Sequence, residues 1–424
     1  MLFTDRYVQR LVQLLEIDTV TPMESHQASQ IAHANAVFAD WAASLGMRVV
    51  FAGPGEVRAH DDYVTPRTVE RLCHEHEGFL DWQPHTVLEI GHGPKHRTLM
   101  FNFHMDTVSP HLPVLLREGC VHGRGAVDNK GPGLAVLAAI EEVQRTHPQV
   151  LRDIRLLIQV VAGEEGGAMG VYGTRYLCER GHVGALNVFV EPSGDGYFDA
   201  STTSMTYEIR MDGDDSTDDF PERGDNASLI LSFMAQEMAR SLAEPVKALD
   251  VKMTLAGIHT GLHHNRVYGS GHCLFNFSYR SADAGRQVAE QVDQAYAAAL
   301  ARCRVAFSGL HPFSFTIERL LSTCSASWLK RDLPVLNNRD AAMETVLMNA
   351  GINPNTCSAE AFTCDAMWAQ ADDAYSIVWG PGSLALNGAH TALEHVRLDD
   401  LESFTRAVHC LITQFATATS HTPN

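Results

Sequence analysis

The chain has 424 residues, of which 45% are hydrophobic and 20% charged, a composition typical of a soluble globular protein with two or three domains. Its formal net charge of −19 argues against nucleic acid and against an anionic membrane surface as partners. No run approaches the ~20 apolar residues of a membrane span, and the first residues do not resemble a secretory signal. The nine cysteines are scattered along the chain, so we expect free thiols and a cytoplasmic protein.

The first part of the chain, up to residue 198, alternates predicted helices and strands. Its polar stretch 53–84 interrupts the alternation, and we interpret it as an insertion or a mobile flap. Alternating strands and helices indicate an α/β unit with a mixed, largely parallel sheet. In chain order, the pattern predicts helices over 2–17, 29–45 and 133–143, and strands over 47–52, 86–90, 99–103, 154–161 and 186–190.

Near residue 199 the pattern changes to a small α+β domain. It predicts strands over 203–211, 251–256 and 273–279, and helices over 227–242 and 284–302. After residue 328 a helix, a strand and a helix resemble the first part again. We therefore predict that residues 1–198 and 315–424 form one catalytic domain, and that residues 199–314 form a domain inserted into it.

Five short segments rich in glycine and polar residues contain the candidate functional groups. Four of them follow an apolar run, and functional groups in open α/β sheets collect at the carboxyl ends of strands. Three carboxylate positions and two histidines can hold two divalent cations if one carboxylate bridges them, which leaves one glutamate to act as a base. The segments are FNFHMDTV with His104, GRGAVDNKGP with Asp128, VVAGEEGG with Glu164 and Glu165, VFVEPSG with Glu191, and NGAHTALEH with His390.

Taken singly, each segment has an ordinary structural explanation. Asp128 could simply occupy a turn, and Glu164-Glu165 could be a solvated acidic loop. The neighbouring glutamates point in different directions, however, so one can bind metal while the other faces a water molecule. Asp106, two residues after His104, could accept the second ring N–H of that histidine. The order of the five segments is a stronger signal than any one of them.

This order resembles the di-zinc aminoacylase and carboxypeptidase family, which includes glutamate carboxypeptidase, acetylornithine deacetylase and succinyl-diaminopimelate desuccinylase. The resemblance covers nearly the whole chain and implies that the inserted domain is a lid through which a homodimer forms. It implies two Zn²⁺ ions, for which Co²⁺ or Mn²⁺ can substitute, and a cis peptide bond after the bridging aspartate. By resemblance, His104 and Glu191 hold one ion, Glu165 and His390 the other, Asp128 bridges them, Glu164 is the general acid/base, and Asp106 braces His104.

The resemblance also implies how the substrate binds. Gly382, in a Gly-Pro-Gly segment, would lie near a substrate carboxylate, and Asn265 and Arg280 of the inserted domain match a substrate-binding asparagine and a carboxylate-binding arginine. The chain departs from the family where the lid normally has a histidine, because Ser216 or Thr217 stands there. Either the metal alone then stabilises the oxyanion, or another group does, such as the histidines of GLHHN, residues 261–265.

The sequence therefore predicts a metal-dependent hydrolase that cleaves an amide bond beside a free carboxylate, of the N-acyl amino acid deacylase type. A dipeptidase or carboxypeptidase acting on short peptides is an alternative that sequence cannot separate, because both reactions cut an amide next to a carboxylate. A catalytically inactive metal-binding interaction protein is an alternative of another class, to which the missing lid histidine lends some weight. In either enzymatic interpretation the partner is a small molecule.

Overall fold

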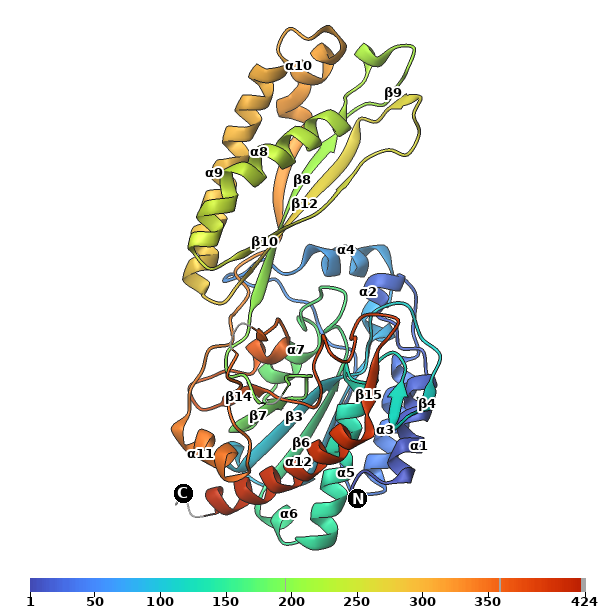
Figure 1. Cartoon of the computed structure of the whole chain (residues 1–424), viewed down its shortest axis with the longest axis vertical. Coiled ribbons are helices and arrows are strands. Elements are labelled where there is room, and N and C mark those ends of the chain that lie inside the picture. Colours follow the sequence, from blue (N-terminus) through green and yellow to red (C-terminus); the bar gives the residue numbers. More distant parts are fainter. Residues whose placement is uncertain (195, 358–359, 421–424) are drawn as a thin grey trace. The chain divides into compact units, whose positions relative to one another are not determined.

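The computed structural model describes residues 1–194, 196–357 and 360–420, and the chain divides into two compact units. The first unit is built from three stretches of sequence and the second from two (Figure 1). The first comprises residues 1–58, 68–201 and 336–424, and the second comprises residues 59–67 and 202–335.

A six-stranded sheet forms the centre of the first unit, with the strand order β1-β2-β6-β3-β7-β14. The pairs β6–β3, β3–β7 and β7–β14 are parallel, whereas β2 runs antiparallel to both of its neighbours. The predicted α/β class with a mixed, largely parallel sheet is confirmed. The strands are β1 (Arg48–Gly53), β2 (His85–Gly91), β3 (Thr98–His104), β6 (Arg155–Val161), β7 (Leu186–Phe189) and β14 (Tyr375–Val378).

Helices cover this sheet and bury its strands, except for the edge strand β1, whose residues are exposed or half-buried. α5 and α12 pack against each other over one face of the sheet (Figure 1). α5 is almost entirely buried, which explains why its sequence is rich in alanine, leucine and valine. The helices of the first unit are α1 (Asp5–Glu16), α2 (Pro22–Ser25), α3 (Ile31–Ala43), α4 (Arg67–Glu75, whose first residue counts with the second unit), α5 (Lys130–Thr146), α6 (Val150–Asp153), α7 (Thr174–Glu179), α11 (Ala341–Asn349) and α12 (Leu398–Thr419).

Strand β3 shows how the sheet positions its functional end. Phe103 packs on Phe38 of α3, with ring centroids 5.0 Å apart, and lies against Gly133 of α5. Asn102 points to the opposite face, where its amide donates to Gln159 of β6 and Thr174 of α7. Alternation along the strand thus anchors both faces. The last residue of β3, His104, is held at the carboxyl end of the parallel strands.

A small three-stranded sheet lies beside the functional end of the first unit and connects two of its loops. β5 (Cys120–His122) pairs antiparallel with both β4 (Leu115–Arg117) and β15 (His395–Arg397). β5 leads into the loop with Asp128, and β15 follows the loop with His390. The pairing of β5 with β15 therefore brings together two segments that lie more than 260 residues apart in the sequence.

The second unit has a four-stranded antiparallel sheet in the order β10-β12-β8-β13, with α8 and α9 packed on it. Along β8 buried residues alternate with partly exposed ones, so one face of this sheet lies on the core while the other is polar. Its elements are β8 (Thr203–Asp212), β9 (Ser216–Thr217), α8 (Ala227–Ala248), β10 (Lys252–His259), β11 (Arg266–Val267), β12 (Ser270–Tyr279), α9 (Ala282–Phe307), α10 (Ser314–Thr323) and β13 (Cys324–Lys330).

The bounds of the second unit differ from the predicted inserted domain of residues 199–314. Residues 315–335 belong to it as well, because β13 pairs with β8 along six residues. The polar stretch 53–84 also differs from a simple flap. It contains α4, and its residues 59–67 join the second unit, where Val64 and Arg331 exchange two backbone hydrogen bonds.

The nine cysteines form no disulfide in the structure, as the scattered pattern predicts. Among the described residues, none of the helices combines the length and the apolar character that crossing a membrane would require.

Candidate metal centre and active site

The five predicted segments converge at one end of the large sheet. Each predicted ligand stands in a loop or at a strand end on that side, where the carboxyl ends of the parallel strands meet. His104 ends β3, Asp128 lies just before α5, Glu165 follows β6, Glu191 follows β7, and His390 lies in the loop before β15.

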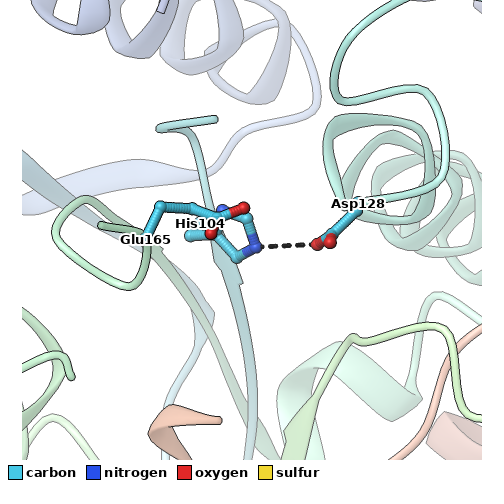
Figure 2. A group of neighbouring side chains, drawn as sticks. All are labelled: His104, Asp128 and Glu165. Carbon is cyan, nitrogen blue, oxygen red and sulfur yellow. Dashed lines mark hydrogen bonds and ion pairs between the residues drawn. The ribbon is translucent and has the colours of Figure 1, made fainter. Parts of the chain in front are cut away.

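The two histidines share the carboxylate of Asp128. Nε2 of His104 lies 3.0 Å from Oδ1, and Nε2 of His390 lies 3.0 Å from Oδ2 of the same residue. Nε2 of His390 also lies 3.1 Å from Oε1 of Glu165, and Nε2 of His104 lies 3.6 Å from Oε1 of Glu191. Figure 2 shows how His104, Asp128 and Glu165 face one another, and one ligand atom from each fits within 4.8 Å.

His104 is fixed by its second ring nitrogen, although not in the predicted way. Nδ1 donates to the backbone carbonyl oxygen of Asp106 at 2.7 Å, because that oxygen can only accept. The carboxylate of Asp106 was expected to take this bond, but its Oδ1 lies 3.8 Å from Nδ1, while its Oδ2 accepts from the backbone N–H of Glu165 at 3.2 Å. Asp106 therefore orients His104 through its main chain, and its carboxylate holds the turn with the two glutamates.

Asn129 connects two of the ligands, and sequence reasoning missed it. Its Oδ1 accepts from the backbone N–H of His104 at 3.0 Å, and its Nδ2 donates to Oε1 of Glu191 at 2.7 Å. The peptide bond between Asp128 and Asn129 is cis, which confirms that prediction. The signal for Asn129 was present in the sequence, since it directly follows the bridging aspartate.

The Glu164-Glu165 pair lies in a turn that requires glycine at both flanking positions, 163 and 166. Gly163 and Gly166 have φ angles of +79° and +66°. A Cβ on Gly163 would lie 2.2 Å from the ring of Tyr172, so both conformation and space require glycine. Within the part of the chain that the structure describes, Glu164 is only partly buried and its carboxylate accepts no hydrogen bond. Both of its oxygens thus remain available for proton transfer.

Burial and mutual repulsion dominate the electrostatics of the site. Hydrogen bonds to Asp128 first, and then to Glu165, raise the pKa of His390 to about 11. Burial acts against ionisation of Asp128, but hydrogen bonds from both histidines hold its pKa well below the usual range. Burial is the main cause that raises the pKa of the other three carboxyl groups, Glu164, Glu165 and Glu191. Repulsion by neighbouring carboxylates adds to it, and the nearby histidines act in the opposite direction.

This donor set fits divalent cations. Four carboxylates and two imidazoles meet here, four of these six groups are buried, and such a surplus of acidic groups is costly unless positive charge neutralises it. The Nδ1 atom of His104 is occupied by a carbonyl oxygen, which leaves Nε2 for a metal. The two oxygens of Asp128 face different histidines, which is the arrangement a bridging ligand needs.

The predicted substrate-binding residues fall into both units. Gly382 lies in the first unit with a φ angle of +76°, and its carbonyl oxygen accepts from the N–H of Gly194 at 2.7 Å. Arg280 and Asn265 lie in the second unit. Arg280 is partly buried just after β12, and Asn265 is exposed in the turn before β11. Their roles toward a substrate stay predictions.

Four further buried polar residues surround the site and were missed. Nζ of Lys130 donates to the carbonyl oxygens of Leu14 and Ile17 at the end of α1, and burial lowers its pKa to about 7. Asp365 accepts from the hydroxyl of Thr174 at 2.6 Å. Lone acidic and basic residues give no periodic signal. Only their proximity to the ligand segments in the sequence could have indicated Arg124, Lys130 and Glu394, and Asp365 lacks even that. The four are Arg124, Lys130, Asp365 and Glu394.

The sequence is similar to that of a curated bacterial protein. It is 26% identical to a succinyl-diaminopimelate desuccinylase of Halorhodospira halophila over 309 residues, which cover 69% of this chain and 74% of that protein.

Solved structures share the fold across almost the whole chain. A metallo-carboxypeptidase from Sulfolobus solfataricus superposes with a TM-score of 0.67 at 13% identity, covering 98% of this chain and 100% of that one. A tripeptidase from Staphylococcus aureus gives a TM-score of 0.65 at 15% identity, covering 97% and 98%. The model of peptidase family M20/M25/M40 matches residues 100–414, which include all five ligand segments, and the chain therefore belongs to that family.

Proposed function

We propose that the protein is a metal-dependent hydrolase that cleaves an amide bond beside a free carboxylate, of the N-acyl amino acid deacylase type. One observation is central to this proposal: His104 and His390 hydrogen-bond to opposite oxygens of Asp128, beside Glu164, whose carboxylate accepts no hydrogen bond from the described residues. Membership of the family and similarity to a desuccinylase, which by its name removes an acyl group, support the same reaction class.

Two Zn²⁺ ions, or Co²⁺ or Mn²⁺ in their place, are the proposed cofactors. His104, Glu191 and Asp128 would hold one, and Asp128, Glu165 and His390 the other. When bound, such ions supply Lewis-acid activation of an amide carbonyl and of a water molecule. The donor set supports zinc, because nitrogen and carboxylate oxygen are ligands that Zn²⁺ accepts.

Glu164 performs the proton transfers in this proposal. Its carboxylate takes the proton from the attacking water and later delivers it to the nitrogen of the leaving amine. Burial and nearby carboxylates raise the pKa of Glu164 well above its usual range, which suits a group that must both accept and return a proton. The hydrogen bond from Nδ1 of His104 to Asp106 fixes the imidazole while this happens.

The missing lid histidine has a candidate replacement within the second unit. β9, which contains Ser216 and Thr217, pairs with β11, whose first residue Arg266 comes two positions after His264. His263 and His264 are both exposed in this loop, and the backbone N–H of His263 donates to the hydroxyl of Tyr268 at 2.9 Å. These contacts support the proposal that one of the two histidines contacts the developing oxyanion.

A substrate screen tests the proposed function. N-acetyl and N-succinyl amino acids, dipeptides and their C-terminal amides are offered to the zinc-loaded protein, and release of free amine is measured. We expect hydrolysis of acylated amino acids with a free carboxylate. Preference for dipeptides would favour the peptidase alternative, and no turnover of any substrate by fully loaded protein would favour the inactive metal-binding protein.

Arg280→Ala is expected to raise KM for a free-acid substrate by ~10–100-fold, because the planar guanidinium can bind both carboxylate oxygens. The amidated substrate should be poor for the wild type and should lose little more in the variant. Arg210→Ala, in the same sheet and paired with Glu208, is the matched control. An equal loss on both substrates would make Arg280 a structural residue and leave Gly382 as the remaining candidate for the carboxylate.

We also propose a cytoplasmic homodimer that forms through the second unit. β10 lies at the edge of its sheet and exposes Leu255 and Ile258, and an unpaired apolar edge favours association with another strand. The nine free thiols support a reducing compartment. Leu255→Lys with Ile258→Lys should convert a dimer in sedimentation velocity into a monomer. A monomeric wild type at micromolar concentration would contradict this proposal.

A further inference from the structure

We infer that Arg124 and Glu394 form a positioning pair, which holds His390 ready to complete the second metal site. The inference rests on the proposed function, because it concerns the ion held by Asp128, Glu165 and His390. The charged group of neither residue contacts the side chain of a metal ligand. They act through the loops in which the ligands stand.

Burial does not hold the side chain of His390 in place. It is exposed, its side chain retaining 49% of its accessible surface, whereas that of His104 retains 1%. Its backbone also has a φ of +63°, which residues other than glycine seldom adopt and which persists only where the surroundings impose it. The loop around His390 must therefore be fixed by other contacts.

Most hydrogen bonds of this loop close it upon itself. Oδ1 of Asn387 accepts from the N–H of Ser383 at 2.9 Å, and Nδ2 of Asn387 donates to the carbonyl of His395 at 3.1 Å. The N–H of His395 donates to the carbonyl of Asn387 at 3.0 Å. Such bonds define the shape of the loop but not its position relative to Asp128.

The pairing of β5 with β15 and the bond from the N–H of Gly123 to the carbonyl oxygen of Glu394 bring the two loops together. Arg124 and Glu394 add side-chain contacts that fix their relative position. Nη1 of Arg124 donates to Oε2 of Glu394 at 2.6 Å and to the carbonyl oxygen of Thr391 at 3.1 Å, one residue after His390. Oε1 of Glu394 accepts from the backbone N–H of Gly125 at 2.9 Å and of Asp128 at 3.4 Å. The pair thus connects the main chain of the bridging aspartate directly to the main chain next to His390.

Both members are buried, which makes the connection stiff. Arg124 is 2% exposed and Glu394 is 1% exposed. Nε of Arg124 also donates to the carbonyl of Pro110 at 3.3 Å, so a third loop is joined to the other two. A buried charge pair favours one geometry over alternatives, although Nη2 of Arg124 has no hydrogen-bond partner among the described residues. By contrast, His104 and Glu191 are fixed by β3, β7 and Asn129, without the pair.

The inference predicts that the two metal sites respond unequally when the pair is broken. Glu394→Gln keeps an oxygen for the Gly125 and Asp128 amides but removes the charge, and Arg124→Met removes the donor. Metal-free protein is titrated with Zn²⁺ against a chromophoric chelator, and Co²⁺-loaded protein is followed by visible absorption. We expect the second ion, held by Asp128, Glu165 and His390, to bind ~10–100-fold more weakly, the usual effect of removing a group that orients a metal ligand. The affinity for the first ion should not change.

Glu89→Gln is the matched control. Glu89 is a buried carboxylate of β2 that pairs with Arg48 and Arg155, and Arg155 begins β6 at the end opposite to the site. The control should lower the melting temperature without changing either metal affinity. Arg124→Lys should restore part of the second affinity, because a lysine can still pair with Glu394.

Two results would overturn the inference: an unchanged second affinity in Glu394→Gln, or equal weakening of both ions. If the variants fail to fold, hydrogen exchange of the wild type decides. The Gly125 amide should stay protected after the metals are removed by a chelator, and loss of its protection would show that the metal, not the pair, fixes the loop. A wild type that binds no second ion would instead refute the proposed function.

Discussion

Replacing Glu164 with glutamine is expected to lower kcat by ~10²–10⁴-fold, the range that a positioned general base contributes. The amide is nearly the same size as the carboxylate but cannot accept the proton of the attacking water. Because Glu164 is partly exposed and its carboxylate accepts no hydrogen bond from the described residues, the variant should keep the metal content and the melting temperature of the wild type. Steady-state kinetics, elemental analysis and calorimetry measure the three quantities.

Glu179→Gln on α7 is the control for a nearby glutamate outside the site, and it should remain fully active. Activity of Glu164→Gln close to the wild type would place the base elsewhere. Loss of metal from this variant would mean that Glu164 is a ligand and that the roles of Glu164 and Glu165 are exchanged.

Asp128→Asn is expected to weaken both metal ions and to abolish activity. The two oxygens of Asp128 face His104 and His390 at 3.0 Å each, and an amide offers one oxygen and one NH₂ group that repels a cation. Removing a group that only orients a metal ligand costs ~10–100-fold in metal affinity. Because Asp128 is itself a proposed ligand, the loss in affinity should be at least as large as the upper end of that range. Metal content after dialysis against a weak chelator measures it.

Asp153→Asn is the comparison, since Asp153 is exposed at the end of α6 just before β6, away from the site. It should keep both ions. If Asp128→Asn lost only one ion while the other bound as in the wild type, Asp128 would be a ligand of a single metal and not a bridge.

Much of the fold could be predicted because its signals are local. The apolar run of β3 followed by His104, and that of β6 followed by Glu164, fix both a strand and the side chain at its end. Parallel strands then bring those ends to one edge. The ligand segments could be recognised for the same reason, since glycine-flanked acidic residues after a buried strand have few structural roles.

What the sequence could not predict depends on partners distant along the chain. β13 belongs to the second unit only because it pairs with β8, more than 100 residues earlier, and its own sequence does not indicate that partner. Residues 59–67 belong there because Val64 pairs with Arg331. The contact of Arg124 with Glu394 spans 270 residues and has no periodic signature.

The metal content of the protein and the position of the metal test the proposed function most directly. Protein purified with excess Zn²⁺, dialysed and analysed by elemental analysis should contain two ions per chain. A crystal structure of the same sample should place them ~2.0–2.2 Å from the nitrogen and oxygen ligands, with Asp128 between them and Glu164 bound to neither. Protein that stays free of metal in excess Zn²⁺, or ions held by other residues, would contradict the proposed site for two metal ions.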